Sequence, residues 1–173
     1  MAGSLKLLEK EVVTSPVSSV DLGGVNWSTN YDNYLVIVNE AYPQTNSTTF
    51  RMRFLRLGLA DTTSSYDYAY EQLKADSGNT ATNGTNLSYT NFQTPGTGGY
   101  ESSNLRLNLF NMNDSSYYSF ATVENFGRPH TAVFRGLQGS FVLKRTIEHN
   151  GVHFYYEGGN INSGTFLLYG YKK

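Results

Sequence analysis

Apolar side chains recur at every second position along much of this chain, in short runs that end at Gly, Asn, Ser, Thr or Pro. In "FRMRFLRLGL", Phe50, Met52 and Phe54 alternate with Arg51 and Arg53. A period of two places these two sets on opposite faces of a β-strand. The run "YLVIVNE", residues 34–40, is almost continuously apolar, which is typical of a strand buried on both faces. The pattern therefore predicts a β-rich protein.

The predicted strands cover residues 5–14, 34–40, 50–59, 105–110, 117–124, 131–137, 140–149, 152–157 and 164–173. Nine or ten short strands without a convincing amphipathic helix predict an all-β fold, a single antiparallel β-sandwich of jelly-roll type with long polar loops. A chain of 173 residues forms one such domain, residues 1–173. The least regular region is residues 75–104. A loop of that length is usually functional or hides a short strand, for which "TNLSYTNF" is the candidate.

Composition excludes several classes of function. The formal net charge is −1, so no basic surface for nucleic acid is expected. Cysteine is absent, so neither disulfides nor thiolate metal sites are available. The first residues, "MAGSLKLLEKEVV", lack the apolar core of a signal peptide, and no apolar run approaches the length that spans a bilayer. We expect a protein without membrane insertion.

The stretch "KRTIEHNGVHFYYE" brings two histidines close together in sequence, as in a metal site. Asn150 and Gly151 between β-rich runs predict a two-residue hairpin turn. That turn places His149 and His153 on opposite faces, and leaves too few ligands for zinc. The cross-strand pairs predicted on the polar face are Glu148 with His153 and Lys144 with Glu157.

Motifs for catalysis and cofactor binding are missing or weak. The chain contains no nucleophile elbow, no His-Glu-x-x-His and no phosphate loop; "GTGGY", residues 96–100, has no following Lys and is interpreted as a turn. His130 is interpreted as a loop contact. The acids Asp61, Asp67, Glu71 and Asp76 are interpreted as solvated rather than as a hydrolase pair. "NMNDSS", residues 111–116, has too few ligands for a firm calcium site. We predict no enzyme activity and no cofactor.

The aromatic residues are a stronger indication of function than these catalytic and cofactor motifs. Tyr66, Tyr68 and Tyr70 recur at period two and would form one face of a strand, and the irregular region adds further rings. Tyrosine among Ser, Gly and Asn is typical of adaptable binding surfaces, because it buries area at low entropic cost. The alternative is that these rings cover the core or a subunit interface. The candidate contact residues are Tyr66, Tyr68, Tyr70, Tyr89, Phe92 and Tyr100.

The order of segments resembles small β-sandwich domains of tailed-bacteriophage virion proteins. The resemblance lies in "EVVTSPVSSVDLGGVNWSTNYDNYLVIVNEA", "FRMRFL", the Tyr-rich stretch, "YYSFATVENFG", "TAVFRGLQGSF" and "GGNINSGTFLLYGYKK", and it covers nearly the whole chain. It implies a tight turn at residues 136–139 before the strand of Ser140, and a closing strand through residues 168–170. Such domains decorate heads or end tail fibres and baseplate appendages, and they share no catalytic residues.

The sequence therefore predicts a structural protein of the virion surface, assembled in the host cytoplasm. The leading hypothesis is a capsid decoration (cement) protein that binds the major capsid protein, because the domain starts at its own Met1 without an added attachment region. A homo-oligomer is expected, with a trimer as one possibility, through exposed sheet edges or a docking strand at residues 1–14. The alternative is a tail-fibre or baseplate module that binds a receptor or a host-surface glycan. The candidate docking residues are Leu5, Leu7, Leu8, Val12 and Val13.

Overall fold

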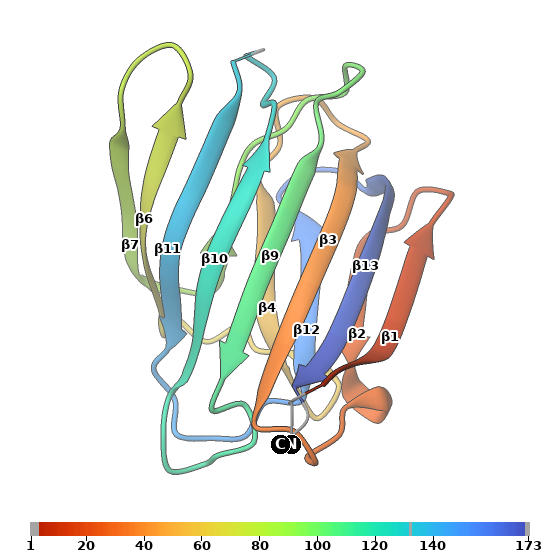
Figure 1. Ribbon diagram of the computed structural model, residues 1–173, viewed down its shortest axis with the longest axis vertical. Coiled ribbons are helices and arrows are strands. Elements are labelled where there is room, and N and C mark those ends of the chain that lie inside the picture. The colour runs from red at the N-terminus through yellow and green to blue at the C-terminus, as the bar shows by residue number, and fades with distance from the viewer. Residues whose placement is uncertain (1–3, 132, 172–173) are drawn as a thin grey trace.

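The protein is a sandwich of two antiparallel sheets packed face to face (Figure 1). The computed structural model describes residues 4–131 and 133–171. Ala132 and Lys172 to Lys173, which belong to two of the predicted strands, lie outside the described residues. The predicted all-β sandwich is confirmed, and the only helix within the described residues is the short 3-10 turn η1 (Gly24–Asn26).

One sheet has eight strands and the other has five. The eight-stranded sheet runs in the order β1 (Leu5–Val13), β13 (Ile161–Tyr171), β3 (Asn33–Pro43), β9 (Ser103–Phe110), β10 (Ser119–Gly127), β11 (Arg135–Leu143), β6 (Tyr66–Lys74) and β7 (Thr80–Leu87). The five-stranded sheet contains β2 (Ser19–Gly23), β12 (Gly151–Tyr156), β4 (Phe50–Arg56) and β5 (Leu59–Ala60), with β8 (Thr90–Asn91) also paired to β4.

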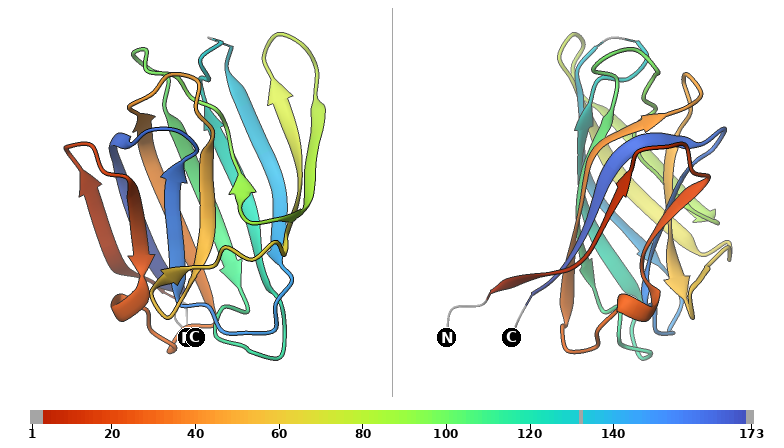
Figure 2. Two further views of the ribbon diagram at one scale, coloured as in Figure 1. Left: turned by 180° about the vertical axis from the view of Figure 1, so that it is seen from behind. Right: turned by 90° about the vertical axis from the view of Figure 1, so that its right-hand side faces the viewer.

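Eight of these strands are connected as a jelly roll. The order β1-β13-β3-β9 in one sheet faces β2-β12-β4-β8 in the other, and successive strands of these eight alternate between the sheets except β4 and β8, which pair within the smaller sheet. Two hairpins are inserted into this framework: β6-β7 lies between β4 and β8, and β10-β11 lies between β9 and β12. Both hairpins join the larger sheet beyond β9, which widens it well past the smaller sheet (Figures 1 and 2).

The core fills the space between the two inner faces, and alternation along each strand supplies it. Phe50, Met52 and Phe54 of β4 are fully buried, whereas Arg51 and Arg53 point to the other face and are half-buried, as the sequence predicted. Rings pack across the interior in addition: Phe154 lies 5.5 Å from Phe50, measured between ring centroids. Buried aromatic rings contribute most of the apolar area of such a core.

The predicted turn at residues 136–139 is wrong. Residues 135–143 form the single strand β11, which pairs without interruption with β10 and β6. Glycine at position 139 serves a close backbone approach instead, because a Cβ there would overlap the carbonyl oxygen of Ala69 on β6. The two strands predicted at residues 131–137 and 140–149 are therefore one, and it ends at Leu143. The predicted closing strand through residues 168–170 is confirmed as part of β13.

The predicted hairpin at Asn150 and Gly151 is also wrong. Residues 144–150 are not a strand; they carry the chain from β11 in one sheet to β12 in the other. Asn150 donates its N–H to the carbonyl of Leu55 and accepts from the N–H of Gly24, which holds it between β4 and β2. A Cβ at Gly151 would overlap the carbonyl oxygen of Leu22. The glycine is therefore required by a neighbouring strand rather than by a turn, and the local signal was overridden by tertiary packing.

The irregular region, residues 75–104, does hide strands, as one of its two interpretations predicted. It contains β7, which pairs with β6, and the two-residue β8. The candidate "TNLSYTNF", residues 85–92, spans the end of β7, a turn and β8 rather than one strand. Residues 80–87 contain few apolar side chains because β7 is an exposed edge strand.

Candidate functional site

The predicted tyrosine face exists, but it points into the sandwich. Tyr66, Tyr68 and Tyr70 share one face of β6 and are 0%, 9% and 4% exposed. The Tyr66 hydroxyl accepts from the backbone N–H of Phe54 at 2.8 Å, and the Tyr70 hydroxyl is hydrogen-bonded to Thr90 Oγ1. Burial raises the pKa of both hydroxyls far above the usual value. These residues belong to the core, which corrects their place in a contact surface.

The other three aromatic candidates do not form a common surface either. Phe92 is 5% exposed and packs in the core. Tyr89 is half-buried, and the guanidinium of Arg51 lies 3.9 Å from its ring centroid, so one face of the ring is occupied. Tyr100 is 83% exposed on a separate loop. The six residues therefore cannot act together as an aromatic platform.

The predicted docking strand β1 is an edge strand whose side chains divide between two faces. Leu5, Leu7 and Val12 are each nearly half exposed, on the outer face of the larger sheet. Leu8 packs partly against the core, and Val13 is buried in it. Of the five predicted docking residues, only Leu5, Leu7 and Val12 are therefore available to a partner.

An apolar band crosses the outer face of the larger sheet from β1 to β11. Cross-strand pairing brings its residues into two adjacent rows, since paired residues share a face. One row includes Leu5 opposite Tyr171 on β13, and Phe120 of β10 between Phe110 and Val142. The other joins Leu7, Tyr169 and Leu35, and it becomes polar at Asn108 of β9 and Thr122 of β10. The band consists of Leu5, Leu7, Leu35, Phe110, Phe120, Val142, Tyr169 and Tyr171; of these, Leu35 is only 4% exposed and adds little accessible surface.

The next row of the same face is still apolar at Leu167 of β13 and Ile37 of β3, but it is polar over β9, β10 and β11, so the band has a boundary there. Arg106 of β9 and Glu124 of β10 are paired there, with 3.9 Å between Nη1 and Oε2, and both are more than half exposed. Soluble proteins rarely leave large contiguous apolar patches exposed unless they bind something. The band is therefore the candidate interaction surface of this protein.

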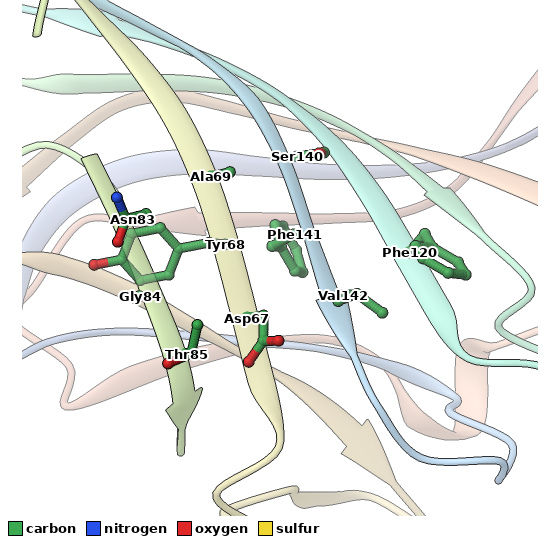
Figure 3. A pocket seen from close by; sticks show the side chains of 10 residues that line it. All are labelled: Asp67, Tyr68, Ala69, Asn83, Gly84, Thr85, Phe120, Ser140, Phe141 and Val142. Atoms are coloured by element: carbon green, nitrogen blue, oxygen red, sulfur yellow. The ribbon is translucent and has the colours of Figure 1, made fainter. Parts of the chain in front are cut away.

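A groove of about 370 Å³ continues the band toward β7 (Figure 3). Ala69 and Ser140 are small and leave the groove open between Phe120 on one side and β7 on the other. The ring of Tyr68 reaches β7 at Gly84, where a Cβ would overlap it. Polar character comes mainly from Asp67, whose carboxylate is paired with Lys144 at 2.9 Å. Such a groove suits an apolar side chain of a partner better than a charged ligand.

The band was missed at the sequence level, although a signal was present. Phe120 and Phe126 occupy the polar phase of the alternation in β10, and Tyr169 and Tyr171 do so in β13. In an outer strand of a sandwich, apolar residues on both phases of the alternation indicate a second contact face.

A polar cluster forms around Asp61, which is 6% exposed, so the interpretation of this carboxylate as solvated is wrong. Asp61 accepts from Arg145 Nη1 at 2.5 Å and from the Thr63 hydroxyl at 2.6 Å. His149 Nδ1 is hydrogen-bonded to Ser119 Oγ at 2.8 Å, and its Nε2 lies 3.7 Å from Asp61 Oδ2. The cluster ties the connection between β11 and β12 to both sheets. The cluster also explains why residues 144–150 do not form the predicted hairpin strand. Arg145 and His149, which lie in this segment, contact Asp61 instead.

The protonation states of this cluster follow from its environment. Burial lowers the pKa of His149 to about 4, against a smaller opposing effect of Asp61. Burial alone would raise the pKa of Asp61, but hydrogen bonds from Thr63 and Arg145 outweigh it and hold that pKa below its usual value. The pair is therefore a neutral imidazole beside a carboxylate at neutral pH.

Ser119, His149 and Asp61 are the residue types of a catalytic triad, but their surroundings differ from those of an active site. Ser119 is 0% exposed and His149 is 1% exposed. The nearby surface groove, of about 270 Å³, is lined by Asp61 and Arg145 and not by Ser119 or His149. A nucleophile must reach its substrate, so the geometry indicates a structural role for these three residues.

The two histidines of "KRTIEHNGVHFYYE" do lie apart, although not through the predicted hairpin. His153 of β12 contacts Asp21 of β2, with 2.5 Å between Nδ1 and Oδ1, instead of Glu148. Lys144 pairs with Asp67, and Glu157 pairs with Arg51 across β12 and β4. The predicted cross-strand pairs are therefore wrong. Within residues 4–131 and 133–171, no group of three or more metal-ligating side chains converges.

The weak loop motifs have structural partners. Asn113, in the stretch considered for calcium, accepts from Trp27 Nε1 at 2.7 Å and donates to the Tyr34 hydroxyl at 2.7 Å, so its amide is committed. In "GTGGY", the N–H of Gly98 donates to the carboxylate of Glu101 at 2.9 Å. A carboxylate in that position would repel a phosphate.

Glu71, Asp76 and His130 each contact a different neighbour and do not form a common site. Glu71 accepts from Asn79, and Asp76 accepts from Ser77. His130 contacts the carbonyl of Thr94 at 3.4 Å, which agrees with a loop contact. Each of these side chains has its own neighbour.

Comparison with protein-family models, curated proteins and solved structures found no significant match to this chain. In the part of the chain that the structure describes, no helix has the length and apolar character needed to cross a membrane.

Proposed function

We propose that this protein is a structural component of a bacteriophage particle, and specifically a capsid decoration protein that binds the outside of the shell. The observation that carries the proposal is the apolar band across the outer face of the larger sheet. The resemblance of the segments to virion-surface domains supports a bacteriophage particle as the location. The partner is the major capsid protein, and the protein is placed at the virion surface.

The band suits docking onto a broad protein surface. It lies on a wide sheet rather than in a cleft, and its residues come from six neighbouring strands of that sheet. Rigid apolar and aromatic side chains lose little entropy on binding. The adjoining groove beside Phe120 adds a place for a protruding side chain of the shell.

The tail-fibre or baseplate alternative has less support. A receptor- or glycan-binding module on this chain was expected to use the tyrosine face, and Tyr66, Tyr68 and Tyr70 are buried. Tyr100 alone does not make a platform for a sugar ring. We keep the tail location as an outcome of the test.

The first experiment locates the protein. Purified particles are separated into capsid and tail fractions, and the chain is quantified in each by mass spectrometry. Many copies per particle in the capsid fraction support decoration. Recovery only in the tail fraction would overturn it and favour the receptor-binding alternative.

The second experiment tests the docking face. Purified protein is added to particles that lack it, and bound copies are counted. Phe120→Glu, between Phe110 and Val142 in the band, should lower occupancy by about tenfold or more, because a charge would be buried at the contact. Leu57→Glu is the matched control, since Leu57 is 85% exposed but lies after β4 of the other sheet. Equal occupancy for both variants would contradict the assignment of the band.

A further inference from the structure

Strand β1 is an open edge of the larger sheet. It pairs with β13 on one side, and no described strand pairs with its other side. The right-hand view of Figure 2 looks onto this edge and shows β1 facing the viewer. An open edge presents unpaired N–H and C=O groups, which makes it a template for another strand.

The charges on this edge lack partners inside the subunit. Among the described residues, Lys6, Lys10 and Glu11 have no hydrogen bond or ion pair, and all three are exposed. Glu9 differs, because its carboxylate accepts from the backbone N–H of Gly23 at 2.6 Å and from Asn26 at 3.0 Å. Two lysines and one glutamate of β1 are thus available to a partner of complementary charge, and Lys6 and Glu11 lie near opposite ends of the strand.

A bulge in the middle of β1 changes which residues share a face. Its register with β13 shifts between Leu7 and Glu9. Before the bulge, Leu5 and Leu7 face outward and Lys6 faces inward; after it, Lys10 and Val12 face outward and Glu11 faces inward. Leu8 and Glu9 both face inward, since Leu8 packs on the core and Glu9 pairs with the buried Leu168.

This arrangement makes the strand complementary to itself. If two copies of β1 run antiparallel about a two-fold axis between Leu8 and Glu9, every pair shares a face, as a sheet requires. In a strand without a bulge, this register would place each inward-facing residue opposite an outward-facing one. The bulge therefore makes the register possible. The resulting pairs are Leu5 with Val12, Lys6 with Glu11, Leu7 with Lys10 and Leu8 with Glu9, each formed twice.

We propose that β1 pairs antiparallel with β1 of a second copy of this chain in that register, which joins the two larger sheets into one continuous sheet. The contact is isologous and closes as a dimer. It places Lys6 opposite Glu11 of the partner subunit and Leu5 opposite Val12 of the partner subunit.

Other pairings of the same edge are less favourable. If the first halves of the two β1 strands pair, Lys6 lies opposite Lys6 of the partner subunit. If the second halves pair, Glu11 lies opposite Glu11 of the partner subunit. Like charges directly opposite each other are destabilising. Pairing Lys6 with Glu9 uses a carboxylate that already has partners. The opposite edge, β7, carries no charged residue that would define a register.

The inference does not rest on the proposed function, because it concerns the purified protein in solution. It is compatible with that function. A two-fold axis perpendicular to the sheet keeps both outer faces on the same side, so the two apolar bands would face one surface together.

Charge exchange tests the register. Sedimentation velocity over a wide range of protein concentration should show a dimer for the unmodified chain. Lys6→Glu and Glu11→Lys should each weaken the dimer by about tenfold or more, because two attractive pairs become two repulsive ones. The double variant restores both pairs and should return the affinity to within about threefold. Lys10→Glu is the matched control, because Lys10 lies opposite an apolar residue.

A monomer at all concentrations up to about 1 mM, or a double variant as weak as the single ones, would overturn the proposal. Cysteine crosslinking gives an independent readout, because the chain contains no cysteine. Directly paired strand residues have Cβ atoms about 4.5–5.5 Å apart, which is close to disulfide range. A mixture of Leu5→Cys and Val12→Cys should form a crosslinked heterodimer under mild oxidation, whereas neither variant alone should. Equal crosslinking in all three samples would also overturn the register.

Discussion

Acidification should unfold this protein in a pH window that His149 defines. In an unfolded chain histidine has a pKa of about 6.5, whereas burial lowers the pKa of His149 to about 4. Between these values the unfolded chain binds a proton that the folded chain does not. Stability is therefore fully present above about pH 6.5 and is lost as the pH falls toward about 4.

The magnitude follows from the two pKa values. The difference between about 6.5 and about 4 corresponds to roughly 3 kcal/mol of unfolding free energy. His149 is 1% exposed, so little solvent screening reduces this value. Asp61 contributes in a different window: its pKa is lowered, so its contribution is present above the unfolded carboxyl pKa and is lost at lower pH than that of His149.

Urea denaturation at a series of pH values measures this dependence. The single tryptophan, Trp27, is a convenient fluorescent probe, because it stacks on Tyr34 at 3.8 Å between ring centroids. His149→Gln should be less stable at pH 7 but should lose most of the slope between about pH 6.5 and 4. His153→Gln is the matched control and should keep that slope. An undiminished slope in His149→Gln would refute the reasoning.

Two further predictions test the core and the strand β11. Tyr66→Phe should cost about 1–3 kcal/mol, because it leaves the buried N–H of Phe54 without its acceptor; Tyr68→Phe, whose hydroxyl has only a 3.4 Å contact, should cost less in the same denaturation assay. Gly139→Ala should cost about 3 kcal/mol or more, because its Cβ would overlap the backbone of β6. Gly136→Ala, with its nearest neighbour at 3.7 Å, should be neutral or up to about 1 kcal/mol stabilising by thermal melting. Equal melting temperatures for the two glycine variants would contradict the assignment of residues 135–143 to one strand.

Much of the fold was predictable because alternation is a local property. Each run such as residues 50–56 or 105–110 carries its inward and outward faces in its own residues, and the strands follow. The predictions that failed depended on glycine. Gly139 and Gly151 have the local signature of turns, yet both are needed where the backbone of a distant strand passes close by. A single sequence does not show which strand that is.

The candidate contact residues were also predicted only in part from the sequence. Period two correctly placed Tyr66, Tyr68 and Tyr70 on one face of a strand, but alternation does not say which face is covered. That depends on the second sheet, which packs over the tyrosine face and leaves Phe120 and Tyr171 on the other side.

The sequence alone thus determined that the chain forms a single β-sandwich and that its first strand is rich in apolar residues. Only the tertiary structure decided that the Asp61 cluster would break the expected hairpin, which face of each strand is buried, and that a bulge shifts the register of β1. The physical reason is that burial and strand register arise from long-range pairing, and the same local pattern is compatible with either face inward until the second sheet is in place.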